Sequence, residues 1–399
     1  PCGSRPRLGA LQVGSPSQPG RATQQPAPKA MAAPELPKPA AKAEPRTPTQ
    51  KECPFVQGEW ASLPRGKVNY LLRGPADAPL VVCLHGLNGS TASFASLEPQ
   101  LLAAGLRVLL FDWYGFGLSA STPRHRLNHE HYVEQLAGLL DAVGVRPDEK
   151  LLILGYSMGG IVAVEFALRF PERVQRVLLV APGGLLEKEE TPCRPFVFGC
   201  LRTRCGCCIL HLVACLAFCC HLPLSFFMRG ERFEGHFNPD VREPHRFADV
   251  RRKNWQRFLW HPRRSLTSYL RVIKSMPLWS EEFRSSYDGL ARSTVPVLFI
   301  WGDDDCTVPW SEVGEEVVDL FSHRDASCIR LPGAGHGLLM EDAEEVGRYA
   351  AAWFHDSKDP AWLALLNRFK LSDPDALEPL DARQVQVNVP TPDILGNKV

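Results

Sequence analysis

The sequence predicts an α/β fold, in which helices cover both faces of a mostly parallel central β-sheet. Short apolar runs typical of buried strands alternate along the chain with longer stretches typical of helices. Apolar runs of this kind are expected where a strand is buried on both faces of its sheet. With 399 residues, 45% of them hydrophobic, the chain is long enough for one sizeable core and appended segments.

The predicted elements follow one another in a regular order. Residues 66–73 alternate between apolar and polar side chains, which is typical of an edge strand. Further strands are expected at 80–84, 107–112, 151–154, 176–181, 295–301 and 326–331, and helices at 130–143, 161–170 and 341–354. In such a sheet the functional residues lie at the carboxyl ends of the strands.

Changes in composition divide the chain into five regions. Residues 1–52 are rich in Pro and Ala and poor in large apolar side chains, so they are predicted to be disordered. The core is expected in two parts, 53–182 and 291–355, because the strand–helix alternation stops between them, over 183–290. Residues 356–399 are expected to form a polar tail with one short helical candidate at 360–369.

The strongest functional signal is the pentapeptide from Gly155 to Gly159, with Ser157 at its centre. It joins a predicted buried strand to a predicted helix, and a serine on such a sharp turn projects its hydroxyl out of the sheet. The backbone N–H groups that follow it lie at a helix N-terminus, where negative charge is stabilised. The motif alone is weak, since a tight turn with a solvated serine is an equally good interpretation.

Three further segments follow predicted strands and support the interpretation of Ser157 as a nucleophile. The first contains His85 and Gly86, whose loop brings backbone close to a bound carbonyl group, and the N–H groups of Leu87 and Met158 are expected to form a two-donor oxyanion hole. His85 itself is expected to orient this loop, with a catalytic role as the less favoured alternative.

The other two segments supply an acid and a base. Three adjacent carboxylates, Asp303 to Asp305, follow the strand at 295–301, and any one of them is placed to orient a histidine. His336 lies between glycines after the strand at 326–331, a setting unlike that of a histidine packed on an apolar helix face.

At this point the chain resembles the α/β-hydrolase superfamily over roughly residues 60–355, and most closely its lipase and esterase branch, which includes monoacylglycerol lipases. The likeness rests on His85-Gly86, 112–119, 155–160, 302–305 with Val308-Pro309, and 333–336. It implies the α/β-hydrolase fold, with a helical cap, or lid, inserted at 183–290. It also implies a catalytic triad of Ser157, Asp305 and His336, in which the spacing to Val308-Pro309 selects Asp305, and a structural role for the Asp112 loop.

The region 183–290 has unusual composition. Eight of the 13 cysteines fall between Cys193 and Cys220, and residues 205–228 contain no charged side chain. A single membrane crossing by this stretch would place Ser157 and His336 on opposite sides of the bilayer, so it is expected to pack on the core or to contact one leaflet peripherally. Its cysteines are interpreted as small apolar side chains or as sites of S-palmitoylation, and metal ligation is disfavoured by their irregular spacing.

Charge and composition limit the remaining functional classes. The net charge of +1 gives no general attraction to nucleic acid, although residues 242–274 hold ten Lys or Arg interleaved with aromatic residues. This basic stretch is interpreted either as an anionic-membrane contact or as a solvated cap face. No secretory signal is apparent, so an intracellular location, cytoplasmic or peripherally membrane-associated, is expected.

The predicted activity is hydrolysis of carboxylic esters with apolar acyl chains, monoacylglycerol being the leading substrate. No metal or other cofactor is predicted. The alternatives are a thioesterase, an acyltransferase or a C–C bond hydrolase that uses the same triad, and a binding protein without enzymatic activity.

Overall fold

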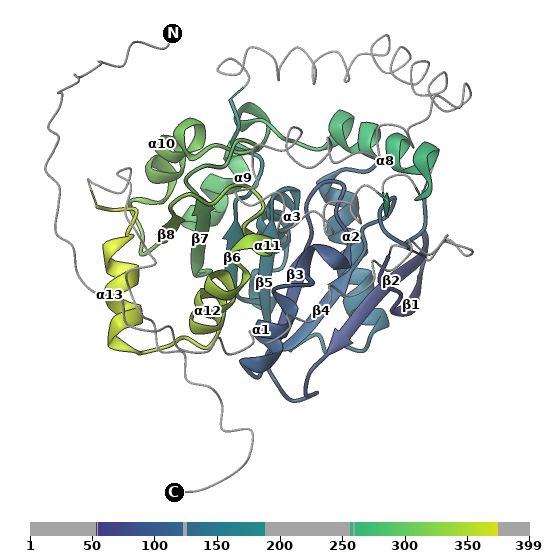
Figure 1. Ribbon diagram of the computed structural model, residues 1–399, viewed down its shortest axis with the longest axis horizontal. Coiled ribbons are helices and arrows are strands. Elements are labelled where there is room, and N and C mark those ends of the chain that lie inside the picture. Colours follow the sequence, from purple (N-terminus) through teal and green to yellow (C-terminus); the bar gives the residue numbers. More distant parts are fainter. Residues whose placement is uncertain (1–52, 54, 123–125, 188–255, 258–259, 374–399) are drawn as a thin grey trace, which may run out of the picture. The chain divides into compact units, whose positions relative to one another are not determined.

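The computed structural model describes residues 53, 55–122, 126–187, 256–257 and 260–373 (Figure 1). Several predictions lie outside these residues. They are the segment 1–52 that is predicted to be disordered, the apolar stretch 205–228 with its cysteines, residues 242–255 and 258–259 of the basic stretch, and residues 374–399 of the predicted polar tail.

An eight-stranded sheet forms the centre of the described structure (Figure 1). In spatial order its strands are β1 (Glu59–Leu63), β2 (Gly66–Arg73), β4 (Arg107–Phe111), β3 (Leu80–Leu84), β5 (Leu151–Tyr156), β6 (Val174–Val180), β7 (Val297–Gly302) and β8 (Ser327–Leu331). β2 is antiparallel to both of its neighbours, whereas the strands from β4 to β8 are all parallel. The mostly parallel sheet predicted from the sequence is therefore confirmed.

The edge of the sheet differs from the prediction. β2 is the second strand, and the outermost position belongs to β1, which pairs with it in a tight hairpin. The alternation of apolar and polar residues along 66–73 indicates only that one face of β2 is partly exposed. This is compatible with an outermost strand and with a second strand. The short, half-exposed β1 has a pattern too irregular to be recognised from the sequence.

The helices form layers on the two faces of the sheet. α2 (His129–Ala142), α3 (Met158–Arg169) and α9 (Ser280–Arg292) pack in one layer, and α1 (Glu98–Ala103) packs with α12 (Ala343–Phe354) in the other (Figure 1). The remaining helices are α8 (Pro262–Ser275), α10 (Trp310–Phe321), α11 (Leu338–Glu341) and α13 (Pro360–Arg368), with 3₁₀ turns at Thr91–Phe94 and Pro171–Arg173. None of the described helices is long and apolar enough to cross a membrane.

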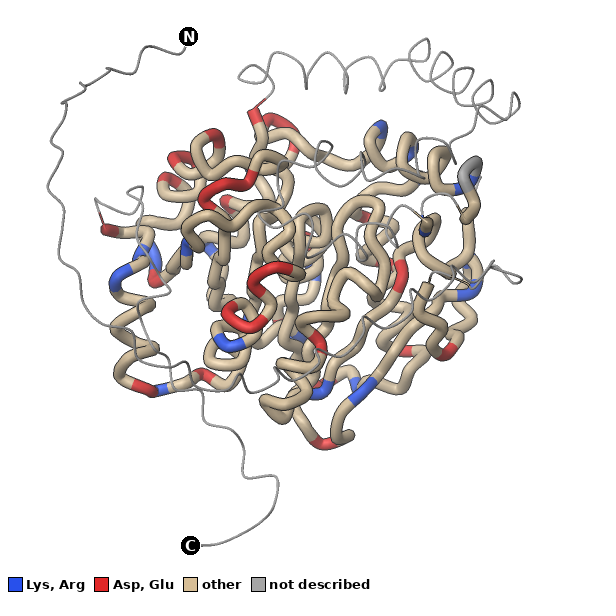
Figure 2. Tube along the Cα trace, viewed as in Figure 1, with Lys and Arg blue, Asp and Glu red and all other residues tan. Residues whose placement is uncertain are grey.

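The interior of the sheet is apolar, as its sequence requires. β3, β5 and β7 contain no charged residue, and all residues of β3 and β7 are buried. Acidic and basic residues lie mainly on the helices and loops around these strands (Figure 2). These three strands therefore form an apolar centre, whereas β6 and β8 each carry an arginine, Arg176 and Arg330.

The predicted boundary of the polar tail at residue 356 is too early. Trp362 and Leu365 of α13 are buried against the core. The chain beyond α13 then runs back along β8, where the N–H of Cys328 donates to the carbonyl of Phe369 over 2.9 Å. Burial of the apolar side chains of this helix makes residues 360–373 part of the core, although polar residues precede and follow it in the sequence.

The segment inserted between β6 and β7 is held at its base. The described part includes α8 and α9. Leu186, after β6, forms a parallel bridge with Trp279, and its carbonyl accepts from the N–H of Ser280 over 2.9 Å. The hydroxyl of the buried Tyr287 in α9 donates to the carbonyl of Gly183 over 2.8 Å. The two ends of the insertion are thus fixed beside each other on the core.

The contact between α3 and β3 depends on a glycine. A Cβ placed on Gly159 would lie 2.0 Å from the carbonyl oxygen of Leu84, so no other residue fits without backbone movement. In contrast, a Cβ on the helical residue Gly138 would meet only the side chain of Leu63, at 3.8 Å.

We therefore expect Gly159→Ala to destabilise the protein by on the order of 3 kcal/mol, because overpacking against backbone cannot relax by a side-chain rotation. Gly138→Ala, the matched control in α2, should be neutral or stabilise by up to about 1 kcal/mol. Urea unfolding of both variants measures the difference. Equal free energies of unfolding would contradict the predicted role of the close approach.

Candidate active site

Ser157 lies on a strained turn between β5 and α3. Its φ of 53° and ψ of −122° are unusual for a residue with a side chain. Three backbone hydrogen bonds hold this conformation. The Ser157 N–H donates to Val180 over 3.0 Å, and its carbonyl accepts from Gly160 over 2.8 Å and from Gly183 over 3.0 Å. The surrounding backbone thus enforces the turn that the pentapeptide predicts.

The glycines of the motif allow this turn to fit between its neighbours. A Cβ on Gly155 would lie 2.8 Å from the side chain of Ala163, and one on Gly160 would lie 2.5 Å from that of Pro182. Gly86 approaches from the loop after β3, where a Cβ would be 3.0 Å from the Cβ of Ser157 and 3.4 Å from its hydroxyl oxygen. The His85-Gly86 loop therefore passes directly over the serine.

A continuous hydrogen-bond chain joins Ser157, His336 and Asp305. Nε2 of His336 lies 3.0 Å from the hydroxyl oxygen of Ser157, and Nδ1 lies 2.7 Å from Oδ2 of Asp305. A carboxylate only accepts hydrogen bonds, so this geometry assigns the proton of a neutral imidazole to Nδ1 and leaves Nε2 as the acceptor of the serine proton. The three residues come from the loops after β5, β7 and β8. Ser157 and His336 are 179 positions apart in the sequence.

Of the three adjacent carboxylates, the structure brings Asp305 to His336. Its side chain is fully buried, and Oδ1 accepts from the N–H groups of Thr307 and Val308, each over 2.8 Å. Asp303 instead pairs with the buried Arg330 over 2.9 Å, and burial nevertheless raises the pKa of its carboxyl group. Asp304 is exposed.

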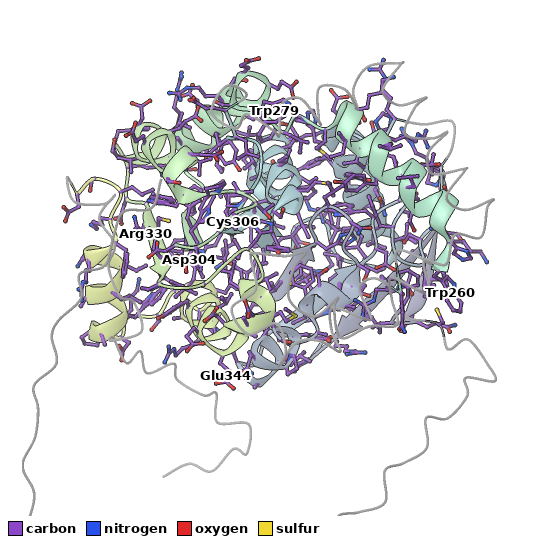
Figure 3. All side chains as sticks on the ribbon, turned by 45° about the horizontal axis from the view of Figure 1, so that its top comes forward. Trp260, Trp279, Asp304, Cys306, Arg330 and Glu344 are labelled. Carbon is purple, nitrogen blue, oxygen red and sulfur yellow. The ribbon has the colours of Figure 1, made fainter. Side chains whose placement is uncertain are left out.

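The loops that carry the acid and the base are tied to each other. The N–H of Asp304 donates to Ala334 over 2.9 Å, and that of Asp303 donates to Leu331 over 3.1 Å. Figure 3 shows Asp304 and Arg330 on the same side of the molecule. The relative position of Asp305 and His336 thus depends on main-chain bonds as well as on their own contact.

The two predicted oxyanion donors are adjacent to the serine. Met158 is the first residue of α3, a position where a backbone N–H has no partner within the helix. Leu87 follows Gly86, and among the described residues no protein acceptor pairs with its N–H. The Leu87 side chain packs both against the main core and against a small apolar cluster that contains Leu270 and Ile273 of α8.

His85 is fully buried, and both nitrogen atoms of its ring form hydrogen bonds. Nδ1 lies 2.8 Å from the carbonyl oxygen of Gly86, and Nε2 accepts from the N–H of Trp113 over 3.1 Å. Burial lowers the pKa of this imidazole to about 4. His85 therefore joins the loops after β3 and β4 as a neutral side chain, an arrangement that agrees with the loop-orienting role expected from the sequence.

Asp112 is likewise part of the framework. This buried carboxyl group accepts from the side-chain amide of Asn69 and from the N–H groups of Thr91 and Leu118, over 2.8–2.9 Å. Desolvation raises its pKa despite these bonds. Gly117, with a φ of 50°, passes so close that a Cβ there would lie 2.1 Å from the carboxyl carbon.

Part of the predicted basic stretch faces the core. Arg271 of α8 donates to the carbonyl of Thr122 over 2.9 Å, and Arg264 donates to that of Ser119. Burial lowers the pKa of both guanidinium groups. These two arginines anchor α8 to the loop between β4 and α2 rather than forming a solvated face.

Sequence reasoning missed contacts that support the site. The hydroxyl of Tyr156 donates to the carbonyl of His336 over 2.7 Å, and Arg330 secures the acid loop through Asp303. Tyr156 occupies a variable position of its motif, and Arg330 lies inside a strand, so neither carries a recognisable signal. Among the described residues no cluster of potential metal ligands is found.

Comparison with known proteins agrees with this architecture. A model described as "Alpha/beta hydrolase family" matches residues 81–349, and the chain belongs to this family. The chain is 28% identical over 284 residues to 1-acylglycerol-3-phosphate O-acyltransferase ABHD5 of Homo sapiens, a match that covers 67% of this chain and 74% of the relative.

Other matches are shorter or concern the fold alone. Similarity to sn-1-specific diacylglycerol lipase ABHD11 of Mus musculus reaches 38% identity over 111 residues, 28% of this chain and 34% of the relative. For that relative and four others the match spans 33–42% of their length. Haloalkane dehalogenase DbeA of Bradyrhizobium elkani USDA94 superposes with a TM-score of 0.58 at 18% identity, covering 75% of this chain and 98% of the dehalogenase.

The buried His85 makes stability depend on pH. An unfolded histidine takes up a proton near pH 6.5, whereas the folded one does so only near pH 4. The unfolded state therefore binds more protons between these values, so acidification through this window should lower the free energy of unfolding, by about 3 kcal/mol from this group. We expect His85→Gln, which retains a donor and an acceptor, to lose this contribution.

Urea unfolding of both proteins from pH 7 to pH 4 measures the effect. The stability difference between wild type and His85→Gln should shrink or reverse as the pH falls. A difference that stays constant with pH would show that His85 does not remain neutral.

Proposed function

We propose that the protein is a serine hydrolase that cleaves carboxylic esters with apolar acyl chains. The observation that carries this proposal is the hydrogen-bond chain from Ser157 through His336 to Asp305, with distances of 3.0 Å and 2.7 Å. Membership of the alpha/beta hydrolase family supports it. Nucleophile, base and acid are already aligned for proton transfer.

In the first half of the reaction, the Ser157 hydroxyl oxygen attacks the ester carbonyl carbon while Nε2 of His336 accepts its proton. The tetrahedral intermediate collapses when the alcohol leaves with that proton, and an acyl-enzyme remains. In the second half, water attacks the acyl carbonyl, His336 again accepts a proton, and Ser157 regains it as the carboxylic acid departs. Asp305 holds the imidazole orientation and stabilises the imidazolium formed in each half.

Negative charge that develops on the carbonyl oxygen requires nearby donors. We assign this role to the N–H groups of Leu87 and Met158, since the Gly86 loop and the start of α3 both lie against the serine. Each donor of this kind contributes roughly 3 kcal/mol to transition-state stabilisation. The positive end of the α3 dipole acts in the same direction.

The substrate class is inferred from the surroundings of the serine. The Leu87 side chain belongs to an apolar cluster with Leu266, Leu270 and Ile273 of α8, which suits an acyl chain better than a charged group. The name of ABHD11 describes a diacylglycerol lipase, which favours an acylglycerol. Monoacylglycerol is the leading candidate.

An acyltransferase is the second candidate, favoured by the longest of the matches described above, to ABHD5. It would share every step up to the acyl-enzyme and differ in whether water or a second alcohol accepts the acyl group. Thioesterase and C–C bond hydrolase activities use the same residues. A binding protein without catalysis would have no need of an aligned triad.

The first test is covalent labelling by a fluorophosphonate probe. Wild-type protein should be labelled, because the probe reacts with an activated serine hydroxyl, and Ser157→Ala should lose the label together with at least ~1,000-fold of its activity toward p-nitrophenyl butyrate. In-gel fluorescence and hydrolysis rates measure the two effects. Labelling that persists in Ser157→Ala would refute the nucleophile assignment.

The second test separates the three carboxylates. Asp305→Asn should lower kcat by on the order of 1,000-fold or more, because an amide cannot hold the imidazole in the required tautomer. Asp303→Asn should mainly lower the melting temperature, since it removes a carboxylate that is paired with the buried Arg330. Asp304→Asn, at an exposed position, is the matched control and should alter neither. Comparable losses of kcat in all three variants would contradict the choice of Asp305.

A further inference from the structure

Tyr156 connects the nucleophile to the loop of the base. It immediately precedes Ser157, and its hydroxyl donates to the main-chain carbonyl of His336 over 2.7 Å. Its ring also lies against the imidazole, with centroids 5.2 Å apart and an angle of 32° between the planes. One side chain thus contacts both the main chain and the ring of the candidate base.

The backbone of Tyr156 is well placed to act as an anchor. It is the last residue of β5 and pairs with Val180 of β6 in the middle of the parallel sheet. Its ring also faces the third loop of the site, because a Cβ on Gly86 would lie 3.5 Å from Cδ1 of Tyr156. Tyr156 therefore contacts the segment that carries the base and lies close to the Gly86 loop, which carries the oxyanion donor Leu87.

The loop of the base needs such an anchor. Gly333, with a φ of 67°, Gly335 and Gly337 give residues 333–337 little intrinsic stiffness. Main-chain bonds fix the loop on either side of His336, at Ala334 and at Gly337. At His336 itself, the main-chain carbonyl accepts from the hydroxyl of Tyr156.

We propose that Tyr156 is a positioning residue that holds His336 at hydrogen-bond distance from Ser157. Its hydroxyl fixes the main chain at residue 336, and its ring limits rotation of the imidazole. This inference rests on the proposed serine-hydrolase function. Displacement of a catalytic group by about 1 Å lowers rates by up to ~100-fold, so a single hydrogen bond at this place has a measurable effect.

The test is Tyr156→Phe, which keeps the ring and removes the donor. Tyr70→Phe is the matched control, because Tyr70 is also half-buried and its hydroxyl also donates over 2.7 Å, to Glu59 at the edge of the sheet. With p-nitrophenyl butyrate, we expect kcat of Tyr156→Phe to fall by ~10-fold while KM changes less than about twofold, since binding contacts are retained. Tyr70→Phe should retain wild-type kcat.

A second readout does not depend on activity. The proton on Nδ1 of His336, shared with Asp305, should give a downfield proton NMR signal in the wild-type protein. The signal should persist in Tyr70→Phe and be broadened or lost in Tyr156→Phe. A lower melting temperature by itself would not remove the NMR signal from Tyr156→Phe alone.

The outcomes separate the two proposals. If the wild type hydrolyses the ester but Tyr156→Phe keeps both wild-type kcat and the NMR signal, the positioning role is refuted while the serine-hydrolase proposal stands. If the wild type neither hydrolyses the ester nor reacts with the fluorophosphonate, the proposed function is refuted, and the NMR comparison still decides whether Tyr156 fixes His336. A fall in kcat with an unchanged NMR signal also counts against the positioning role.

Discussion

The left-handed backbone conformation of Ser157 is the constraint on which the rest of the site depends. A positive φ at a residue with a side chain costs on the order of 1–3 kcal/mol, and it persists only where neighbours over-determine it. Here the carbonyl of Val180 and the N–H groups of Gly160 and Gly183 do so. Central strands with fully buried side chains provide the rigid support, because a close-packed core resists small displacements.

Contacts between loops, and not only the bonds among Ser157, His336 and Asp305, define the geometry around this serine. The loops after β7 and β8 are joined by main-chain bonds, such as the one from Asp304 to Ala334. Neutral His85 joins the loops after β3 and β4, and buried Asp112 organises the second of these from within. His85 and Asp112 are both buried and both find their hydrogen-bond partners in neighbouring loops, so the need to satisfy these polar groups also sets the positions of the loops.

Features that depend on residues close together in the chain can be predicted from the sequence, whereas contacts between distant residues cannot. The strand before Ser157 and the helix after it are local patterns, and the structure contains both where they were expected. The spacing of Asp305 to Val308-Pro309 is also local, and the N–H of Val308 does bind that carboxylate. In contrast, the contact from Tyr156 to His336 spans 180 positions, and the edge strand β1 is defined by its partner rather than by its own pattern. Non-local contacts of this kind leave no periodicity in a single sequence.

The paired ends of the segment between β6 and β7 have a consequence for how such a protein changes over evolution. Leu186 and Trp279 lie side by side, so the chain between them is a loop closed on the core. The entropic cost of a closed loop rises by only about 0.6 kcal/mol for each doubling of its length. Added length in the part of this segment that precedes α8 is therefore inexpensive in stability and leaves the bond from Gly183 to Ser157 in place. The length of this segment can therefore change over evolution while the backbone that holds Ser157 is unaffected.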